Sequence, residues 1–249
     1  MSLIAESKAP KDTTLNQDSS HSTAIEFRHV SKSYLEGDRE HYVLSEMDFI
    51  LPKGEIIVLL GRSGSGKSTI LNLISGIDLP TKGEIVAKEL SLSAMNEEER
   101  TLFRRKHIGF IFQFFNLIPT LTVLENLLLP LELNDITGNE ATKRCMNMLE
   151  EVGLSNRSGS FPDMLSGGEQ QRIALARALI HEPDIVLADE PTGNLDAETG
   201  AKVIALLDRL IRKRGKTMIM ATHSRDVIRL ADKVYSMKIG TMQLQEMDK

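Results

Sequence analysis

The sequence has almost no cysteine, no long hydrophobic run and no basic block. Cys145 is the only cysteine among 249 residues, which excludes an intramolecular disulfide and is typical of a reducing compartment. No apolar run approaches the ~18 residues that a membrane-spanning helix needs, and no apolar signal-peptide region follows Met1. If a membrane is involved, we expect another polypeptide to span it. The net charge of −5 makes nucleic acid an unfavoured partner.

A glycine-rich stretch from residue 61 to residue 69 carries the strongest signal in the chain. It reads GRSGSGKST and fits the pattern G-x-x-x-x-G-K-[ST] in full. The apolar run Ile56 to Leu60 leads directly into it, and apolar residues at helical spacing follow it. A glycine-rich turn that merely precedes a helix would not need the lysine, the hydroxyl and the strand in register. We therefore expect the loop to bind a nucleoside triphosphate through Gly61, Arg62, Ser63, Gly64, Ser65, Gly66, Lys67, Ser68 and Thr69.

The residue types in this loop explain the chemistry. Glycines let the backbone turn sharply and point successive N–H groups at a polyphosphate. The N-terminus of the following helix adds partial positive charge. Lys67 supplies a point charge for the β- and γ-phosphates, and Ser68 offers a hydroxyl to Mg²⁺.

The start of the chain predicts a tail followed by a β-rich segment. Residues 1–23 are polar and without periodicity, so we interpret them as a disordered tail before a folded unit at 24–249. Ile25, Phe27 and His29 alternate with charged residues, and a second alternating stretch runs over 47–51. These stretches predict half-buried antiparallel strands.

Between these two strands lies an aromatic side chain with two interpretations. Tyr34 belongs to the turn-prone segment Ser33 to Gly37. Its ring is either part of a small satellite core or a flat surface for an adenine ring, and position alone does not separate the two.

Three helical segments are predicted from charge and apolar periodicity. One covers 96–106, with Asn96 as its N-terminal cap and acidic residues in its first turn. The region 124–153 is expected to form two helices with a break at Gly138. A third helical stretch is expected at 226–231, before a terminal hairpin.

Polar side chains follow several apolar strand candidates at the point where each strand ends. Gln113, Asp189 and His223 each come directly after a short buried-strand candidate, as the phosphate loop does. Because strands alternate with helices here, we expect an α/β fold with a mostly parallel sheet and its ligand at the carboxyl edge of the strands.

Two adjacent carboxylates and a histidine are the candidates for chemistry at this edge. Asp189 is the expected carboxylate for Mg²⁺, acting directly or through water. Glu190 can reach the water that attacks the γ-phosphorus and act as general base; the alternative is an acid that only supports its neighbours. His223 either donates to the γ-phosphate or is an ordinary core histidine.

Two stretches have both a plain and a functional interpretation. The basic group Arg104, Arg105 and Lys106 is most simply a solvated helix end, and the alternative is a contact with anionic lipid. The segment Phe114 to Leu121 is unusually apolar for one that contains a proline, and half of the eight phenylalanines fall between residues 110 and 115. It is either core or a docking site for a partner.

A second helix start carries a different anion-binding signature. Residues 165–172 read LSGGEQQR and open a strongly helical run. Serine and two glycines at a helix N-terminus can bind an anion without a lysine.

Together these motifs resemble the nucleotide-binding subunit of ABC transporters, over residues 24 to the end. The motifs that carry the resemblance, in chain order, are the phosphate loop, Gln113, 165–170, 185–190, 194–196 and His223. The wording ADEPTGNLD at 188–196 and FQFFNLIP at 112–119 is similar to the lipoprotein-release and macrolide-export subgroup, which also includes a cell-division ATPase.

The resemblance implies a fold and roles that spacing alone does not give. It implies a P-loop ATPase with an N-terminal antiparallel β subdomain and a helical subdomain inserted at about 114–170. Tyr34 matches an aromatic that stacks on adenine, Gln113 a glutamine that senses Mg²⁺ and γ-phosphate, and His223 a switch histidine. A second copy of the chain would bind the γ-phosphate of the first, so that two chains enclose two ATP molecules. The residues implied on that second face are Ser166, Gly167, Gly168, Glu169 and Asp196.

The resemblance also implies a membrane partner. A separate permease subunit would dock near Phe114, Phe115 and Leu117 and hold the chain at the cytoplasmic face of the inner membrane. ATP hydrolysis by the chain would then drive a conformational change in the permease. The alternatives are the same ATPase on a non-transporting, signalling membrane complex, and a soluble ABC protein of translation or DNA repair. The last class has two cassettes in one chain or a long coiled-coil insertion, and this chain has neither.

Two positions depart from the pattern of the resemblance. Glu169 stands where many relatives have glutamine, and Ser224 follows the switch histidine where aspartate is usual. The second departure puts in doubt the support of the loop at His223.

Overall fold

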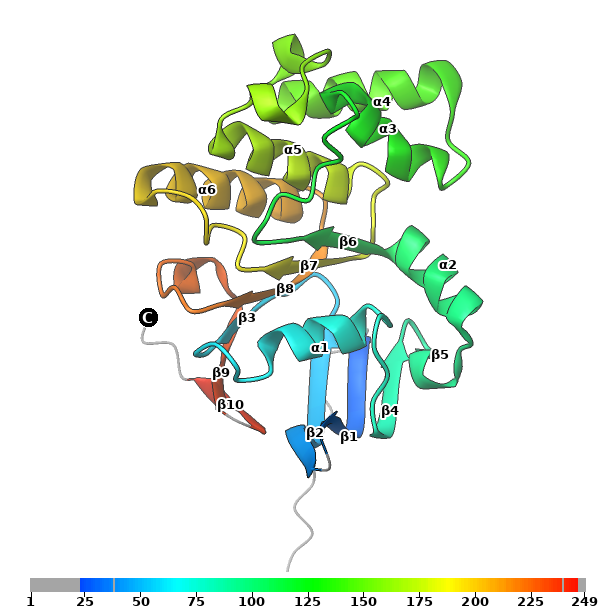
Figure 1. Ribbon diagram of the computed structural model, residues 1–249, viewed down its shortest axis with the longest axis vertical. Helices are drawn as coiled ribbons and strands as arrows, with labels where there is room; N and C mark the ends of the chain where they lie inside the picture. The colour runs from blue at the N-terminus through cyan, green and yellow to red at the C-terminus, as the bar shows by residue number, and fades with distance from the viewer. Residues whose placement is uncertain (1–22, 38, 239, 246–249) are drawn as a thin grey trace, which may run out of the picture.

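The computed structural model describes residues 23–37, 39–238 and 240–245, so the tail predicted for 1–23 lies outside the described residues apart from Thr23. Two sheets and a group of helices make up the molecule (Figure 1). The first sheet is antiparallel, in the order β2-β1-β4-β5. Its strands are β1 (Thr23–Glu36), β2 (Arg39–Pro52), β4 (Lys82–Ala87) and β5 (Leu90–Ser91).

The second sheet has six strands in the order β10-β9-β3-β8-β7-β6, and β10 alone among them runs antiparallel to its neighbour. Its central strands β3 and β8 are buried along their whole length, as expected for parallel strands covered on both faces. The strands are β3 (Ile56–Leu60), β6 (Ile108–Ile111), β7 (Ile185–Asp189), β8 (Thr217–Thr222), β9 (Lys233–Lys238) and β10 (Thr241–Gln245).

Helices cover both faces of this sheet, and the alternation along β3 shows which core lies on which face. Ile57 and Leu59 belong to one core with α1 and the antiparallel sheet, whereas Val58 belongs to a second core with α3 to α6. Among the described residues, every helix is too short or too polar to cross a bilayer. The helices are α1 (Lys67–Ile74), α2 (Glu97–His107), α3 (Val123–Glu132), α4 (Gly138–Glu151), α5 (Gly167–Leu179) and α6 (Ala197–Lys213).

Several local predictions are confirmed. The side chain of Asn96 accepts a hydrogen bond from the N–H of Glu99, and the Glu99 carboxylate accepts one from the N–H of Asn96, so α2 begins with a capping box. The predicted break separates α3 from α4, although it covers residues 133–137 and Gly138 is the first residue of α4. The two alternating N-terminal stretches pair as antiparallel strands.

Three local predictions are wrong. His29 is exposed, with φ of 49°, because a register irregularity between Phe27 and Val30 interrupts the alternation. Strand β1 continues to Glu36, so Tyr34 lies in a strand and the turn comes at Gly37. The segment 226–231 contains only the 3-10 turn Ile228–Leu230.

The short turn at 228–230 has a physical reason. The Asp232 carboxylate accepts a hydrogen bond from the backbone N–H of Ile56 at 2.7 Å and pairs with Arg212. These bonds draw the chain into β9 at Lys233 before a longer helix can form.

Candidate functional site

The carboxyl ends of four neighbouring parallel strands converge on one cavity. The phosphate loop follows β3, Gln113 follows β6, Asp189 ends β7 and His223 follows β8. The cavity has a volume of about 810 Å³ and is also lined by Glu190 and, from the β1–β2 hairpin, by Glu36, His41 and Val43, which the sequence did not single out. The predicted catalytic groups and the phosphate loop are therefore brought together in one chain.

The phosphate loop bends so that its carbonyl oxygens face the side chain of Lys67. Lys67 is buried, and its Nζ donates to the carbonyl oxygens of Gly61 at 2.8 Å and Arg62 at 3.1 Å. Gly64 and Gly66 have φ of 78° and 95°, a conformation that favours glycine. The N-terminus of α1 has no side-chain cap and no acidic residue in its first turn, so its backbone N–H groups remain open to a phosphate.

Asp189 lies beside the first turn of α1. Burial raises the pKa of its carboxyl, the neighbouring Glu190 charge raises it further, and a hydrogen bond with Ser68 opposes this. Bringing a cation to this carboxylate would relieve the same penalty. A hydroxyl and one carboxylate fit Mg²⁺, which binds few protein ligands and completes its shell with water and substrate phosphates. Within the described residues no cluster of three His, Cys, Asp or Glu forms a closed metal cage.

Glu190 is held at both carboxylate oxygens. Its Oε2 accepts a hydrogen bond from Thr222 Oγ1 at 3.0 Å, and its Oε1 lies 2.9 Å from Nδ1 of His223 and 4.0 Å from Nζ of Lys67. The backbone of Glu190 has φ of 46°, which is uncommon for a residue with a side chain. The structure thus fixes this carboxylate between a lysine, a threonine and a histidine at the mouth of the cavity.

The structure decides between the two interpretations of His223 and adds Thr222 to the residues of the site. His223 exposes 69% of its side chain, so it is not a core histidine. Because the Glu190 oxygen is an acceptor, Nδ1 of His223 donates and Nε2 is left for another partner. Thr222 was missed by the sequence analysis, although a polar residue at the buried end of β8 was the available signal.

Gln113 is tied to the loop that follows β7. Its carbonyl oxygen accepts a hydrogen bond from Nδ2 of Asn194 at 2.9 Å, and its Nε2 lies 3.4 Å from Oδ1 of the same residue. A Cβ at Gly193 would lie 3.0 Å from this Nε2, so a larger residue there would press on the glutamine. The loops that follow β6 and β7 are therefore linked.

Tyr34 lies beside the phosphate loop without lining the cavity. Its hydroxyl donates to Oδ2 of Asp78 at 2.8 Å, and Nζ of Lys32 lies 4.8 Å from the centre of its ring. The residue is 40% exposed, which does not fit a satellite core.

The start of α5 and Asp196 lie apart from the phosphate loop of the same chain. They line a separate hollow of about 1140 Å³. Ser166 caps α5, Glu169 closes a capping box with it, and the Oδ1 of Asp196 accepts from Thr199 N–H at 3.0 Å to cap α6. Gly168 packs against Thr199, where a Cβ would meet a methyl group at 2.5 Å. Of the predicted nucleotide-binding residues, this group and Tyr34 do not line the cavity that holds the phosphate loop.

The backbone of the apolar segment Phe114 to Leu121 is bonded to polar side chains of α3 and α5. Asn126, fully buried on α3, donates to the carbonyl oxygens of Ile118, Leu121 and Thr122 and accepts from Ile118 N–H. Arg177 on α5 donates to the carbonyl oxygens of Phe115 and Asn116. The sequence analysis found neither of these polar residues.

The segment itself is divided between surface and core. Phe114 is 68% exposed, whereas Leu117 is half-buried against the larger core.

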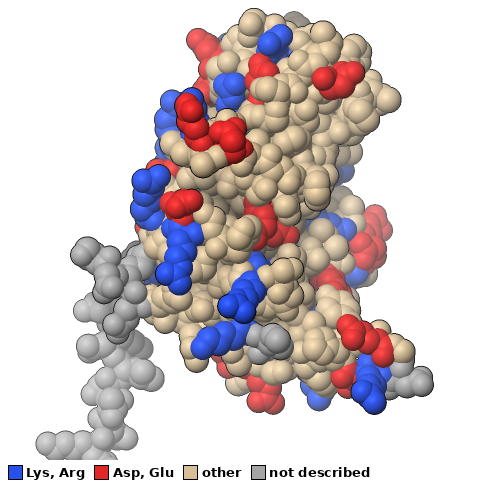
Figure 2. All heavy atoms as spheres, turned by 60° about the vertical axis from the view of Figure 1, so that its left-hand side comes forward, with Lys and Arg blue, Asp and Glu red and all other residues tan. Residues whose placement is uncertain are grey.

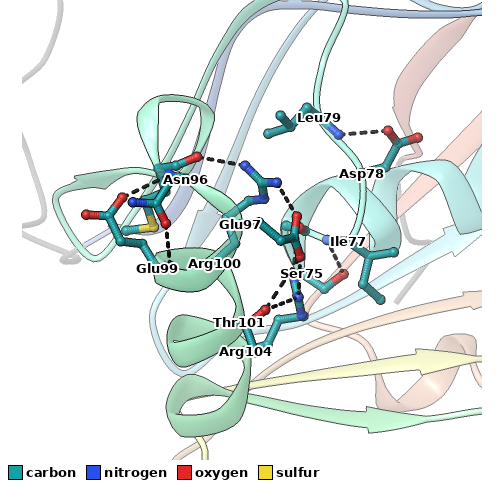
Figure 3. A network of polar contacts seen from close by, with 12 residues as sticks. Ser75, Ile77, Asp78, Leu79, Asn96, Glu97, Glu99, Arg100, Thr101 and Arg104 are labelled. Carbon is teal, nitrogen blue, oxygen red and sulfur yellow. Dashed lines mark hydrogen bonds and ion pairs between the residues drawn. The ribbon is translucent and has the colours of Figure 1, made fainter.

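Part of the charged surface is paired within the chain. Arg104 donates to the carbonyl oxygen of Gly76 and to Glu97, so the basic group at the end of α2 is partly occupied by its own chain (Figure 3). On the face shown in Figure 2, acidic and basic side chains intermingle. Residues of α6 form ion pairs within that helix, as Lys202 does with Glu198, and with α4, as Lys213 does with Glu151.

Comparison with known proteins shows one family that the chain resembles over most of its length. The family model described as "ABC transporter" matches residues 44–193. An uncharacterized ABC transporter ATP-binding protein of Mycobacterium tuberculosis is 50% identical over 218 residues, 88% of each chain. The lipoprotein-releasing system ATP-binding protein LolD of Legionella pneumophila is 42% identical over 86% of this chain and 95% of its own. The solved ATP-binding cassette MJ0796, described as a dimer in a post-hydrolysis state bound to ADP and Pi, is 38% identical with a TM-score of 0.81, covering 90% of this chain and 100% of that one.

Proposed function

The chain belongs to the ABC transporter family, and we propose that its cavity binds Mg-ATP between two copies of the chain and hydrolyses it to move a separate permease subunit. The protein is an ATP-binding and ATP-hydrolysing subunit with the ABC ATPase fold.

The observation that carries the catalytic proposal is the position of Glu190. Its carboxylate lies at the end of β7 with both oxygens held, so it can accept a proton from a water aimed at the γ-phosphorus. Lys67 and the backbone N–H groups of the loop stabilise the charge that develops on the phosphoryl oxygens. His223 directs its free nitrogen to the γ-phosphate while Thr222 keeps Glu190 from rotating away.

The residues also fit the metal that such chemistry uses. Ser68, Asp189 and Gln113 are the groups that would hold Mg²⁺, which supplies charge neutralisation between the β- and γ-phosphates when bound. Tyr34, beside the loop, would stack on the adenine ring.

The separation of the two anion-binding helix starts supports a shared site. Ser166, Gly167, Gly168 and Asp196 lie in a different hollow from Lys67 of the same chain. A second chain, turned to face the first, would bring its own α5 start to the γ-phosphate. The solved relative MJ0796 is described as a dimer, which supports this arrangement.

The exposed Phe114 supports docking to a permease at the cytoplasmic face of the inner membrane. It follows Gln113 directly, and one relative belongs to a lipoprotein-releasing system. Fully burying a phenylalanine contributes about 1.5–3 kcal/mol, enough for one anchor to matter. Phe114→Ser should leave the melting temperature unchanged and abolish co-fractionation with membranes, whereas Leu244→Ser, another exposed apolar residue on β10, should change neither. Retained membrane association of Phe114→Ser would contradict the docking site.

Glu190→Gln tests the catalytic assignment. Turnover should fall by roughly 10²–10⁴-fold with ATP affinity retained, because the amide cannot accept the proton. Uncleaved ATP should then hold two chains together in size-exclusion chromatography. The control Glu140→Gln, on the exposed face of α4, should hydrolyse ATP normally. Near-normal turnover in Glu190→Gln would remove it from the mechanism.

A further inference from the structure

The ring of Tyr34 is held at its edge and behind one face. The hydroxyl donates to Oδ2 of Asp78 at 2.8 Å, while Nζ of Lys32 donates to Oδ1 of the same carboxylate at 2.6 Å. That Nζ also lies over the ring, 4.8 Å from its centre. Lys32 is buried at 9% exposure, whereas Tyr34 is 40% exposed, so the lysine backs the ring and part of the ring stays open.

Asp78 takes its own position from the helix that follows the phosphate loop. It lies just beyond the end of α1, where the N–H groups of Ile77 and Asp78 both donate to the carbonyl oxygen of Asn72. Its Oδ1 also accepts from the N–H of Leu79 at 2.8 Å, and Lys32 donates to the carbonyl oxygen of Leu79. The backbone of Asp78 is therefore fixed to the end of α1, and its carboxylate links Lys32 and Tyr34 of β1 to that helix.

Helix α2 holds this turn from outside (Figure 3). Arg104 donates to the carbonyl oxygen of Gly76 at 2.7 Å, and Arg100 packs its side chain where a Cβ on Gly76 would lie, 3.2 Å from its Cδ. Gly76 has φ of 66°, which suits glycine at the end of a helix. The distance between the phosphate loop and Asp78 is thus set by a rigid helix held at its far end.

Tyr34 would otherwise be poorly placed for stacking. It lies three residues from the turn at Gly37, in a strand pair whose register shifts between Lys32 and Ser33, and its neighbour Leu35 is 80% exposed. A ring on such a hairpin loses conformational entropy when a base binds. Holding the ring in place before binding lowers this entropic cost.

We propose that Asp78, together with Lys32, is a positioning residue that holds the Tyr34 ring at a fixed distance from the phosphate loop for the base of a nucleoside di- or triphosphate. This rests on the proposed stacking role of Tyr34. The charge states agree with the geometry. Burial alone would raise the pKa of Asp78, but the bonds from Lys32 and Tyr34 hold it below its usual value. Burial and the bond to Asp78 raise the pKa of Tyr34, so the hydroxyl remains a donor.

The test compares binding of ADP with binding of pyrophosphate, which has the phosphates and no base. Tyr34→Ala should weaken ADP by about ten- to a hundredfold and leave pyrophosphate unchanged. Asp78→Ala should weaken ADP by roughly three- to tenfold, the size of one net hydrogen bond, again without changing pyrophosphate. In the Tyr34→Ala background, Asp78→Ala should add nothing. Asp78→Asn keeps an acceptor for the hydroxyl and should recover most of the ADP affinity.

Each outcome tests either the stacking role of Tyr34 or the positioning role of Asp78. If Tyr34→Ala binds ADP normally, the stacking role itself fails. If Tyr34→Ala weakens ADP while Asp78→Ala does not, stacking stands and positioning is overturned. A matching loss of pyrophosphate in Asp78→Ala would assign Asp78 to the stability of the loop and also overturn it. Lys32→Met, which keeps the apolar stem behind the ring and leaves Asp78 in place, should weaken ADP alone; Asp48→Ala, an exposed aspartate on β2, is the control that should change neither ligand.

Discussion

The two glycine-rich helix starts of this chain differ in what is bonded to the free backbone N–H groups of the first turn. Helix α1 begins at Gly66 with no side-chain cap, and the nearest cation, Lys67, belongs to its own first turn. Helix α5 begins with Ser166, whose side chain accepts from the N–H of Glu169, while Oε2 of Glu169 accepts from the N–H of Ser166 at 2.9 Å and from its hydroxyl at 2.8 Å. The start of α1 has no side-chain cap, whereas the start of α5 is capped by the side chains of Ser166 and Glu169.

The difference indicates two kinds of phosphate contact. An uncapped helix start with a buried lysine is ready to bind a polyphosphate within one chain. The capping box bonds the N–H groups of Ser166 and Glu169 and adds a negative charge to the helix start, which Arg157 partly offsets through its Nε, 3.2 Å from Glu169 Oε1. Such a surface suits a weaker contact that forms only when a second chain brings its nucleotide to it.

The largest expected effect comes from placing lesions at both helix starts. Lys67→Ala and Ser166→Arg should each reduce the turnover of a homodimer by about 10²–10³-fold in every site. The first removes a positive charge from the phosphates, and the second replaces the capping hydroxyl of α5 with a bulky side chain. A mixed dimer of the two chains collects both lesions in one site and leaves the other intact, so its ATPase activity should exceed that of either homodimer. Activity no higher than in the homodimers would show that the two helix starts do not share a nucleotide.

A pair of glycine substitutions separates the two helix starts within one chain. Gly66 has φ of 95° and a Cβ there would lie 3.1 Å from a methyl of Val43, whereas a Cβ at Gly167 would make ordinary contacts at 3.5 Å with Leu195. A side chain in the left-handed conformation costs about 1–2 kcal/mol. The free loop of Gly66→Ala should therefore relax out of this conformation, and restoring it on binding should weaken ADP about tenfold. Gly167→Ala should bind ADP as the parent chain does. Equal effects on calorimetric ADP affinity would contradict the distinction.

Removing the cap of α5 should affect stability and spare ADP binding. Ser166→Ala deletes the acceptor for the N–H of Glu169 and is expected to cost about 1 kcal/mol. In a chain of this size that lowers the melting temperature by about 2–4 °C. Ser166→Thr, which keeps the hydroxyl, is the control and should melt with the parent. An unchanged melting temperature in Ser166→Ala would mean that the cap contributes nothing.

The smallest effect is expected from the charge of Glu169. Glu169→Gln keeps a capping group and removes a negative charge from the first turn, so the ATP-bound dimer should become about two- to fivefold tighter. Bonds from the N–H and hydroxyl of Ser166 hold the pKa of Glu169 below its usual value. Its stabilising contribution is therefore complete above the ordinary glutamate pKa and is lost as the pH falls through the lowered one. Glu169→Gln should remove that part of the acid dependence of melting; a dimer no tighter than the parent's would contradict the charge argument.

Local signals predicted the frame of the site because each of them lies within a few residues. The capping box of Asn96, the phosphate loop after β3, and the polar residues at strand ends depend on neighbours in the sequence or on the common direction of parallel strands. The class of fold follows from the same signals.

The contacts that position the site could not be predicted in this way. Thr222 meets Glu190 across 32 positions of sequence, and Tyr34 meets Asp78 across 44. Pairing at such separations depends on how the strands are ordered in the sheets, which the periodicity of one sequence does not give. The same limit explains the exposed His29, since the irregularity that turns it outward arises between β1 and both of its partner strands.

The bonds that Asn126 and Arg177 make to the segment after Gln113 have a mechanical consequence. A loop held only by its ends would absorb a push by bending. Here five backbone carbonyl groups between Phe115 and Thr122 accept hydrogen bonds from side chains of α3 and α5. Force applied at Phe114 is therefore carried into α5 along its length, and the far end of that helix is Ser166. We therefore expect a displacement of this segment to be passed to α5 rather than absorbed by bending of the segment.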